Sequence, residues 1–105
     1  RNCQPGQIAL SSVGNAIEAM MRAVAREVAP RIRINAVSPG TIDTPMVTAQ
    51  GVEREDLYNK MTKNNLIPRA GTADEVAQGI LFVIKNNFVT GTTVDVYGGW
   101  LLQGL

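Results

Sequence analysis

The sequence predicts an α/β fold of parallel strands joined by helices, and three observations predict it. Two long segments repeat apolar residues at steps of three and four, which is the helical period. Two short runs rich in β-branched residues indicate buried strands. Helical segments separate one run from the next, as the crossover connections between parallel strands require.

The first predicted helix begins near residue 10 and ends before Pro30, which cannot continue the helical hydrogen bonds. Ser11 and Ser12 are expected to cap its N-terminus rather than to act as an acid or base. Its apolar stripe consists of Leu10, Val13, Ile17, Met20, Val24 and Val28. A second stripe of small residues, Ala16, Ala19 and Ala23, lets another helix approach closely. Together the two stripes are more than one sheet face needs.

A short strand is predicted over residues 32–37, in the run RIRINAV. It breaks into a loop at Ser38-Pro39-Gly40, because proline and glycine interrupt regular structure. A weaker helix is predicted over residues 52–63, between two loops.

A second strong helix is predicted after Thr72, which stands three residues before Glu75 in a capping-box pattern. The helix is expected to end near residues 85–87. A last strand over residues 92–96 and a turn at Gly98-Gly99 close the chain. The residues that this helix is expected to bury are Val76, Ala77, Ile80, Leu81 and Ile84.

No domain boundary is visible, so residues 1–105 are predicted to form a single partial domain. Two strands are too few for a self-sufficient parallel sheet, because such a sheet needs cover on both faces and protection at its edges. The chain also starts with Arg1 rather than methionine. We therefore expect the end of a larger sheet within a longer polypeptide.

The composition argues against several classes of function. The 105 residues carry a net charge of +1 and their basic residues are scattered, which argues against a nucleic-acid or membrane partner. The chain has no histidine, so neither a Ser-His-Asp triad nor a histidine-based zinc site can form within it, and no metal is predicted. Cys3 is the only cysteine, which favours a cytoplasmic location.

Four stretches in order give the chain a family resemblance: AVAREVAPRIRINAVSPG, then TPM, then RAGTADEVAQGILFVI, then VTGTTVDVYGG. With them, the chain resembles the C-terminal half of a short-chain dehydrogenase/reductase. The resemblance implies the C-terminal portion of a Rossmann-type doubly wound parallel sheet. It also implies an oxidoreductase that moves hydride between NAD or NADP and a carbonyl or alcohol. The glycine-rich phosphate motif of dinucleotide sites, G-x-G-x-x-G, is absent from the sequence.

The resemblance implies a cofactor-binding loop at Pro39, Gly40, Ile42 and Thr44. In the family, backbone groups at the Ile42 position and the hydroxyl at the Thr44 position hold the nicotinamide carboxamide and a nearby phosphate. Gly40 is expected to let the backbone pass close to the flat ring. A simple strand-terminating turn is the alternative for the loop.

The resemblance also places the family's catalytic tyrosine and lysine, which lie four residues apart on one helix face. Aligned backwards from AREVAPRIRINAVSPG without a gap, the tyrosine position is Leu10 and the lysine position is Gly14. Leucine has no proton to exchange and glycine has no charge. No catalytic residue is therefore predicted in this chain.

The substrate lid of the family corresponds to Met46, Val47 and Tyr58, for which an amphipathic surface helix is the alternative. The family's subunit contacts correspond to the helix at residues 11–29 and to the region 73–105. The resemblance therefore implies a homo-oligomer and a small carbonyl or alcohol substrate.

Two hypotheses follow for the function. In the first, the chain supplies the nicotinamide loop, lid and subunit interface of an NAD(P)-dependent oxidoreductase, without being catalytically competent alone. In the second, it is a truncated, non-catalytic α/β module that self-associates.

Overall fold

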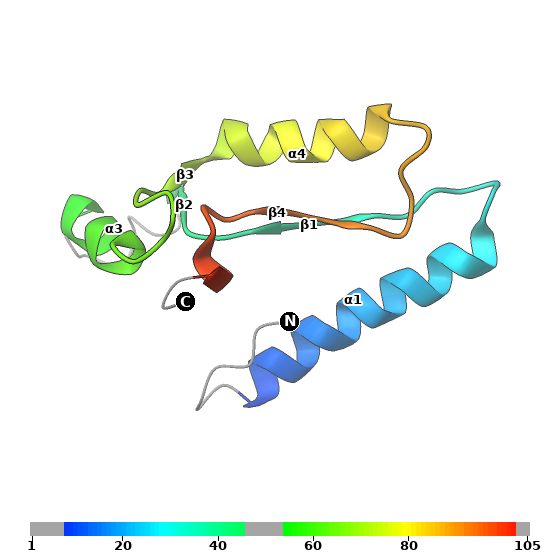
Figure 1. Ribbon diagram of the computed structural model, residues 1–105, viewed down its shortest axis with the longest axis horizontal. Helices are drawn as coiled ribbons and strands as arrows, with labels where there is room; N and C mark the ends of the chain where they lie inside the picture. Colours follow the sequence, from blue (N-terminus) through cyan, green and yellow to red (C-terminus); the bar gives the residue numbers. More distant parts are fainter. Residues whose placement is uncertain (1–7, 46–53, 103–105) are drawn as a thin grey trace. The chain divides into compact units, whose positions relative to one another are not determined.

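The computed structural model describes residues 8–45 and 54–102 (Figure 1). Its contacts divide the chain into two compact units, Arg1–Ala36 with Val83–Val94, and Val37–Phe82 with Asp95–Leu105. The prediction of one partial domain stays a prediction. The elements in chain order are α1 (Ile8–Val28), β1 (Ala36–Pro39), β2 (Ile42–Asp43), α3 (Arg54–Thr62), β3 (Gly71–Thr72), α4 (Ala73–Lys85), β4 (Thr93–Val96) and the 3-10 helix η1 (Trp100–Leu102).

In the first unit, α1 confirms the predicted helix but begins earlier than expected. It starts at Ile8, so Ser11 and Ser12 lie inside its first turns and the prediction that they cap the helix is wrong. Ala9 and Leu10 are strong helix formers, which explains the earlier start. Met21 and Ala25 are the buried apolar residues that the structure describes on this helix.

The predicted strand over residues 32–37 is wrong at its start, because β1 begins only at Ala36. The reason is a change of hydrogen-bond partners just before it. The Ile34 amide donates to the Thr90 hydroxyl, and the Thr92 amide donates to the Asn35 side-chain oxygen. Side chains thus replace the backbone partners of these two amides, while the Ile34 carbonyl still accepts from the Gly91 amide, and a regular strand forms only afterwards.

Arg33 ties the start of this segment to the end of α4. Its guanidinium donates to the carbonyl oxygens of Val83, Ile84 and Val89, at 2.6, 2.7 and 3.0 Å. The last carbonyl groups of a helix have no partner within the helix. The arginine therefore satisfies acceptors at the C-terminal end of α4 and fixes the loop that follows it.

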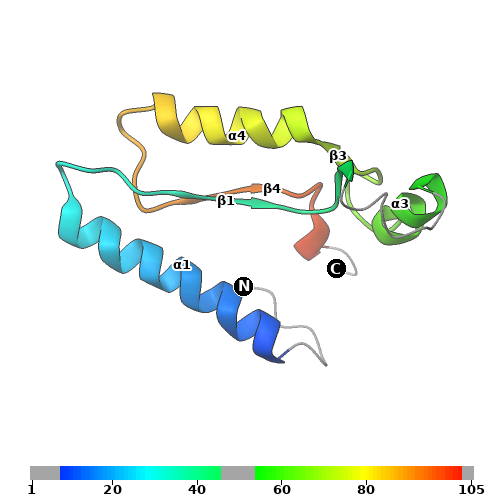
Figure 2. The same cartoon turned by 180° about the vertical axis from the view of Figure 1, so that it is seen from behind.

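β1 pairs with β4, and the two strands lie side by side in both Figure 1 and Figure 2. The Ala36 amide donates to the Thr92 carbonyl, and the Gly40 amide donates to the Val96 carbonyl, four residues further along each strand. The strands therefore run in the same direction, which confirms the predicted α/β class with parallel strands.

The second unit contains a strand pair that the sequence did not predict. β2 and β3 are parallel, with Ile42 opposite Gly71 and Asp43 opposite Thr72. Both strands are only two residues long, so they have no alternation that a sequence pattern could reveal. The predicted weaker helix is present as α3.

α4 begins with the predicted capping box. The Glu75 amide donates to the Thr72 hydroxyl at 3.1 Å, and the Thr72 amide donates to the Glu75 carboxylate at 2.9 Å. The predicted burial of the apolar residues on this helix is wrong for several of them. Ile80, Leu81 and Ile84 are 43%, 48% and 58% exposed, because no other described element covers this side of the helix.

Candidate functional site

The predicted cofactor loop follows β1, where the strand gives way to β2. Pro39 is the last residue of β1 and is exposed, while Gly40 and Ile42 are half-buried. Thr44 follows β2 directly. The four residues thus lie at the carboxyl end of a parallel strand, which is where α/β folds bind their ligands.

Gly40 is required by a protein contact, and the expectation that it makes room for the nicotinamide ring stays a prediction. A Cβ atom on Gly40 would lie 2.8 Å from both the Cα and the Cβ of Tyr97 and 3.1 Å from its carbonyl oxygen. Real Cβ atoms are not found this close to other heavy atoms. The glycine therefore lets the loop lie against Tyr97, which follows β4 directly.

The backbone of Ile42 faces the open edge of β2. The Gly71 amide donates to the Thr41 carbonyl at 2.9 Å, and Ile42 stands opposite Gly71 in the parallel register. In such a ladder the residues on either side of Ile42 bond the neighbouring strand, so the Ile42 amide and carbonyl point to the opposite edge. Among the described residues, no strand pairs with that edge. One donor and one acceptor therefore stand side by side there.

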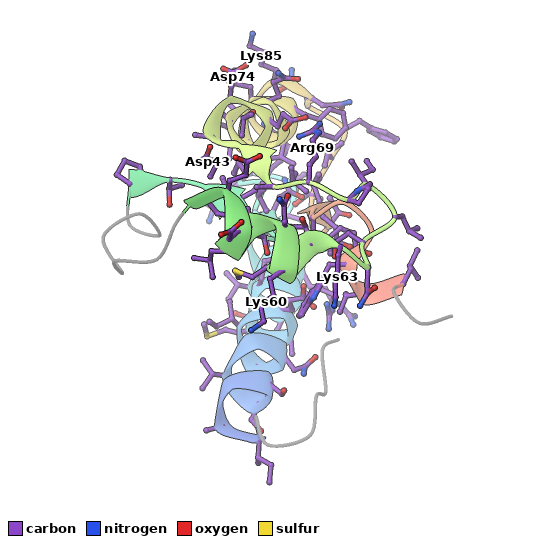
Figure 3. The ribbon with its side chains drawn as sticks, turned by 90° about the vertical axis from the view of Figure 1, so that its left-hand side faces the viewer. Asp43, Lys60, Lys63, Arg69, Asp74 and Lys85 are labelled. Atoms are coloured by element: carbon purple, nitrogen blue, oxygen red, sulfur yellow. The ribbon has the colours of Figure 1, made fainter. Side chains whose placement is uncertain are left out.

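Tyr58 reaches from α3 to the end of this loop. Its side chain is buried, and its hydroxyl lies 3.2 Å from the Asp43 carboxylate and 3.2 Å from the Thr44 amide nitrogen. Figure 3 shows Asp43 beside α3. Sequence reasoning included Tyr58 only as a lid residue and missed Asp43, because their contact joins residues fifteen positions apart.

A cavity of about 240 Å³ lies in the second unit, beside the β2–β3 pair. Arg69, Glu75 and Asp95 are the charged residues of its lining, and Arg69 forms an ion pair with Glu75 at 2.8 Å. Sequence reasoning found Glu75 by the capping box, but nothing in the sequence pattern singles out Arg69. The cavity is lined by Thr41, Ile42, Ile67, Arg69, Gly71, Glu75, Asp95, Val96, Tyr97 and Gly98.

The electrostatics of this edge centre on Glu75. The Arg69 guanidinium donates to both oxygens of the carboxylate, and the Thr72 amide donates to one of them. The hydrogen bond from Arg69, followed by the bond from Thr72, lowers the pKa of Glu75 from 4.5 to about 2. The same bond raises the pKa of Arg69 above its usual value. The pair therefore stays ionised near neutral pH, so neither side chain acts as a general acid or a general base.

The positions of the family's catalytic pair lie on α1, in the first unit. Leu10 and Gly14 are both within the helix, one turn apart. A Cβ atom on Gly14 would meet nothing within 4 Å, so a larger side chain fits at this position. The lid candidates Met46 and Val47 lie outside the described residues.

Residues 8–45 and 54–102 contain neither a metal-binding cluster nor a membrane-spanning helix. No group of three or more His, Cys, Asp or Glu side chains is placed there to hold a metal ion. No helix in these ranges has the length and apolar character needed to cross a membrane.

Comparison with protein families and solved structures supports the sequence resemblance. The family model described as enoyl-(acyl carrier protein) reductase matches residues 2–101. The short-chain reductase protein NovJ of Streptomyces niveus is 33% identical over 90% of this chain, and carbonyl reductase family member 4 of Xenopus tropicalis is 38% identical over 93% of it. A crystal structure of a small-chain dehydrogenase in complex with NADPH superposes with a TM-score of 0.83 and 34% identity over 97% of the chain.

The matches cover nearly all of this chain but only part of each relative. The chain spans 38% of the NovJ sequence, 41% of the Xenopus protein and 47% of the chain in the NADPH complex. The solved structures also confirm the predicted Rossmann-type α/β fold. The chain belongs to the short-chain dehydrogenase/reductase family.

Proposed function

We propose that this chain forms the nicotinamide-binding side of an NAD(P)-dependent oxidoreductase that acts on a carbonyl or alcohol substrate. The observation that carries the proposal is the open edge of β2. A primary carboxamide presents one carbonyl acceptor and an amino donor, and the Ile42 amide and carbonyl form the complementary pair. Thr44, two residues further on, adds the hydroxyl of the predicted site.

The residues present fit the nicotinamide end of the cofactor. When bound, the cofactor would supply the hydride, while Ile42 would orient the ring through its carboxamide. A solved relative was crystallised with NADPH, which supports a nicotinamide cofactor for this chain too. NAD and NADP both remain within the proposal.

The chain alone is proposed to bind rather than to catalyse. The helix positions that carry the acid/base pair in the family hold Leu10 and Gly14, neither of which can move a proton. In the second unit, the ion pair of Arg69 and Glu75 is held in its charged form. Proton transfer therefore has to come from groups other than these.

The second candidate function is a non-catalytic module that self-associates, and the exposure of α1 favours it. Val13, Ile17 and Met20 are 57%, 53% and 62% exposed on one helical stripe. Exposed apolar residues grouped in this way mark interaction surfaces. A homo-oligomer through the helix at residues 11–29 and the region 73–105 is compatible with either function, so cofactor binding separates the two.

The decisive experiment is a titration with NADH and with NADPH, followed by nucleotide fluorescence. Ile42→Pro removes the amide hydrogen that faces the open edge, together with the isoleucine side chain, and it leaves the Thr41 carbonyl available to the Gly71 amide. Proline is tolerated at such an outward-facing position of an edge strand. We expect saturable binding to the unchanged protein and binding at least about tenfold weaker to Ile42→Pro.

Ile42→Val is the matched control, because it keeps the amide and a β-branched side chain. It is expected to bind the cofactor like the unchanged protein, and circular dichroism checks that all three proteins fold alike. No saturable binding of either nucleotide would leave the self-associating module as the better reading. Equal binding by Ile42→Pro would remove the carboxamide contact from the proposal.

A further inference from the structure

The Tyr58 hydroxyl accepts one hydrogen bond and donates another, and both partners lie in the loop that follows Ile42. The Thr44 amide donates to the phenolic oxygen, and the hydroxyl donates to the Asp43 carboxylate, each at 3.2 Å. The side chain is only 7% exposed. A substrate carbonyl would have to displace one of these partners to reach the hydroxyl, so Tyr58 does not serve as a ready proton donor.

The helix that carries Tyr58 is itself held firmly at this point. The Thr62 hydroxyl donates to the Tyr58 carbonyl at 2.7 Å, and Thr62 is fully buried. Asn65, just beyond the end of α3, is also buried, and its backbone amide donates to the Thr62 carbonyl. The ring is therefore presented from a packed helix end, and its hydroxyl has a fixed position.

The two atoms that Tyr58 holds lie on consecutive residues. Asp43 is the last residue of β2, and Thr44 is the first residue after it. Fixing a carboxylate on one and the backbone amide of the next sets the orientation of the peptide group between them. This peptide group directly follows Ile42–Asp43, so its orientation sets where the open edge of β2 ends and where the Thr44 hydroxyl stands.

We propose that Tyr58 is a positioning residue that holds the nicotinamide loop in its binding conformation through Asp43 and the Thr44 amide. The inference rests on the proposed function, since it concerns the same loop. It assigns α3 a task in cofactor binding that needs no contact between Tyr58 and the cofactor. Because the loop is already ordered before the cofactor binds, less of the binding free energy is lost in ordering it, which is the effect of preorganisation.

Tyr58→Phe tests the inference, because it keeps the buried ring and removes only the hydroxyl. We expect about tenfold weaker binding of the nicotinamide cofactor and faster hydrogen exchange at the Thr44 amide, on the order of tenfold. Asn59→Ala is the matched control. It changes a neighbouring, exposed residue of α3 without altering charge, and both measurements should stay as in the unchanged protein.

A double-mutant cycle distinguishes positioning from a general loss of stability. Asp43→Ala removes the carboxylate partner, whereas Asp43→Asn keeps an oxygen that can accept from Tyr58. If the bond positions the loop, Asp43→Asn binds cofactor better than Asp43→Ala, and Tyr58→Phe weakens binding less in Asp43→Ala than in the unchanged protein, because only the bond to the Thr44 amide is then left to lose. Fully additive effects on affinity would overturn the inference.

The two proposals fail in different ways. If the unchanged protein binds neither NADH nor NADPH, the proposed function fails and takes the inference with it. If the unchanged protein binds cofactor but Tyr58→Phe shows the same affinity and the same exchange at Thr44, only the role of Tyr58 is wrong.

Discussion

At the scale of single residues, two glycines with different surroundings predict opposite effects of the same substitution. A Cβ atom on Gly40 would meet the Tyr97 backbone at 2.8 Å, and backbone atoms cannot move aside as the end of a flexible side chain can. Gly40→Ala is therefore expected to lower the free energy of unfolding by about 1–3 kcal/mol, as overpacking does. Urea denaturation measures the change.

Gly14→Ala is the natural comparison. Its added methyl group meets nothing within 4 Å, and it lies in the interior of α1. Alanine is favoured over glycine in a helix, so the free energy of unfolding should rise by up to about 1 kcal/mol. Equal destabilisation by both substitutions would mean that the contact with Tyr97 is not what requires glycine at residue 40.

These residues also show how far the sequence could predict the candidate site. The positions of Pro39, Gly40, Ile42 and Thr44 followed from the motif, and the loop lies at the end of a parallel strand as expected. The contact between Gly40 and Tyr97 did not follow, because Tyr97 lies 57 positions further along the chain. Contacts between distant segments leave no periodic signal in a sequence.

At the scale of elements, the start of α4 predicts a dependence of stability on pH. The pKa of Glu75 is lowered from 4.5 to about 2 in the folded chain, mainly by Arg69. The unfolded chain therefore binds the proton more readily, so this contribution is fully present above pH 4.5 and is lost as the pH falls toward 2. Glu75→Gln should be less stable at neutral pH, and its deficit should shrink as the pH falls through this window.

The measurement is the urea midpoint of each protein as a function of pH. Asp74→Asn is the control, because it removes the neighbouring carboxylate of the first turn, which accepts a hydrogen bond from Gln78 rather than from Arg69. The Asp74→Asn variant should still lose stability as the pH falls through this window. A constant difference between Glu75→Gln and the unchanged protein at all pH values would contradict the assignment to Glu75.

The elements themselves were predicted unevenly, and their length and partners explain why. The helical spacing of apolar residues, sustained over many residues, was sufficient to predict α1 and α4, and the capping box located the start of α4. The strand before Ala36 was overextended, because the Ile34 amide bonds the Thr90 hydroxyl and the Asn35 side-chain oxygen accepts from the Thr92 amide, so side chains interrupt the backbone ladder. The pair β2–β3 was missed, because two residues carry no alternation.

At the scale of the whole molecule, the exposed apolar residues show that a sequence pattern cannot decide whether an apolar face is buried. The period of α1 and α4 correctly indicates apolar faces, yet Met20 is 62% exposed and Ile84 is 58% exposed. A sequence pattern shows that a face is apolar but not what covers it. The predicted burial on α4 was wrong for this reason.

The exposed stripe of α1 leads to a prediction about assembly. Ile17 is 53% exposed between Val13 and Met20, which are also exposed, and removing this stripe from water would stabilise a complex between copies of the chain. Since Ile17 is not buried within the chain, Ile17→Glu should leave the fold intact while placing a charge in the interface. We expect the unchanged protein to self-associate and Ile17→Glu to weaken the association by at least about tenfold, because a buried, unpaired charge is costly.

Sedimentation over a range of concentrations measures both proteins, with Arg22→Gln as the matched control. Arg22 is exposed on the same helix, and its replacement by glutamine changes the net charge by the same amount as Ile17→Glu does. A specific effect of the stripe requires that Arg22→Gln associate like the unchanged protein. An unchanged protein that stays monomeric at high concentration would contradict the proposed homo-oligomer. Equal association of all three proteins would instead place the contact away from α1, in the region 73–105.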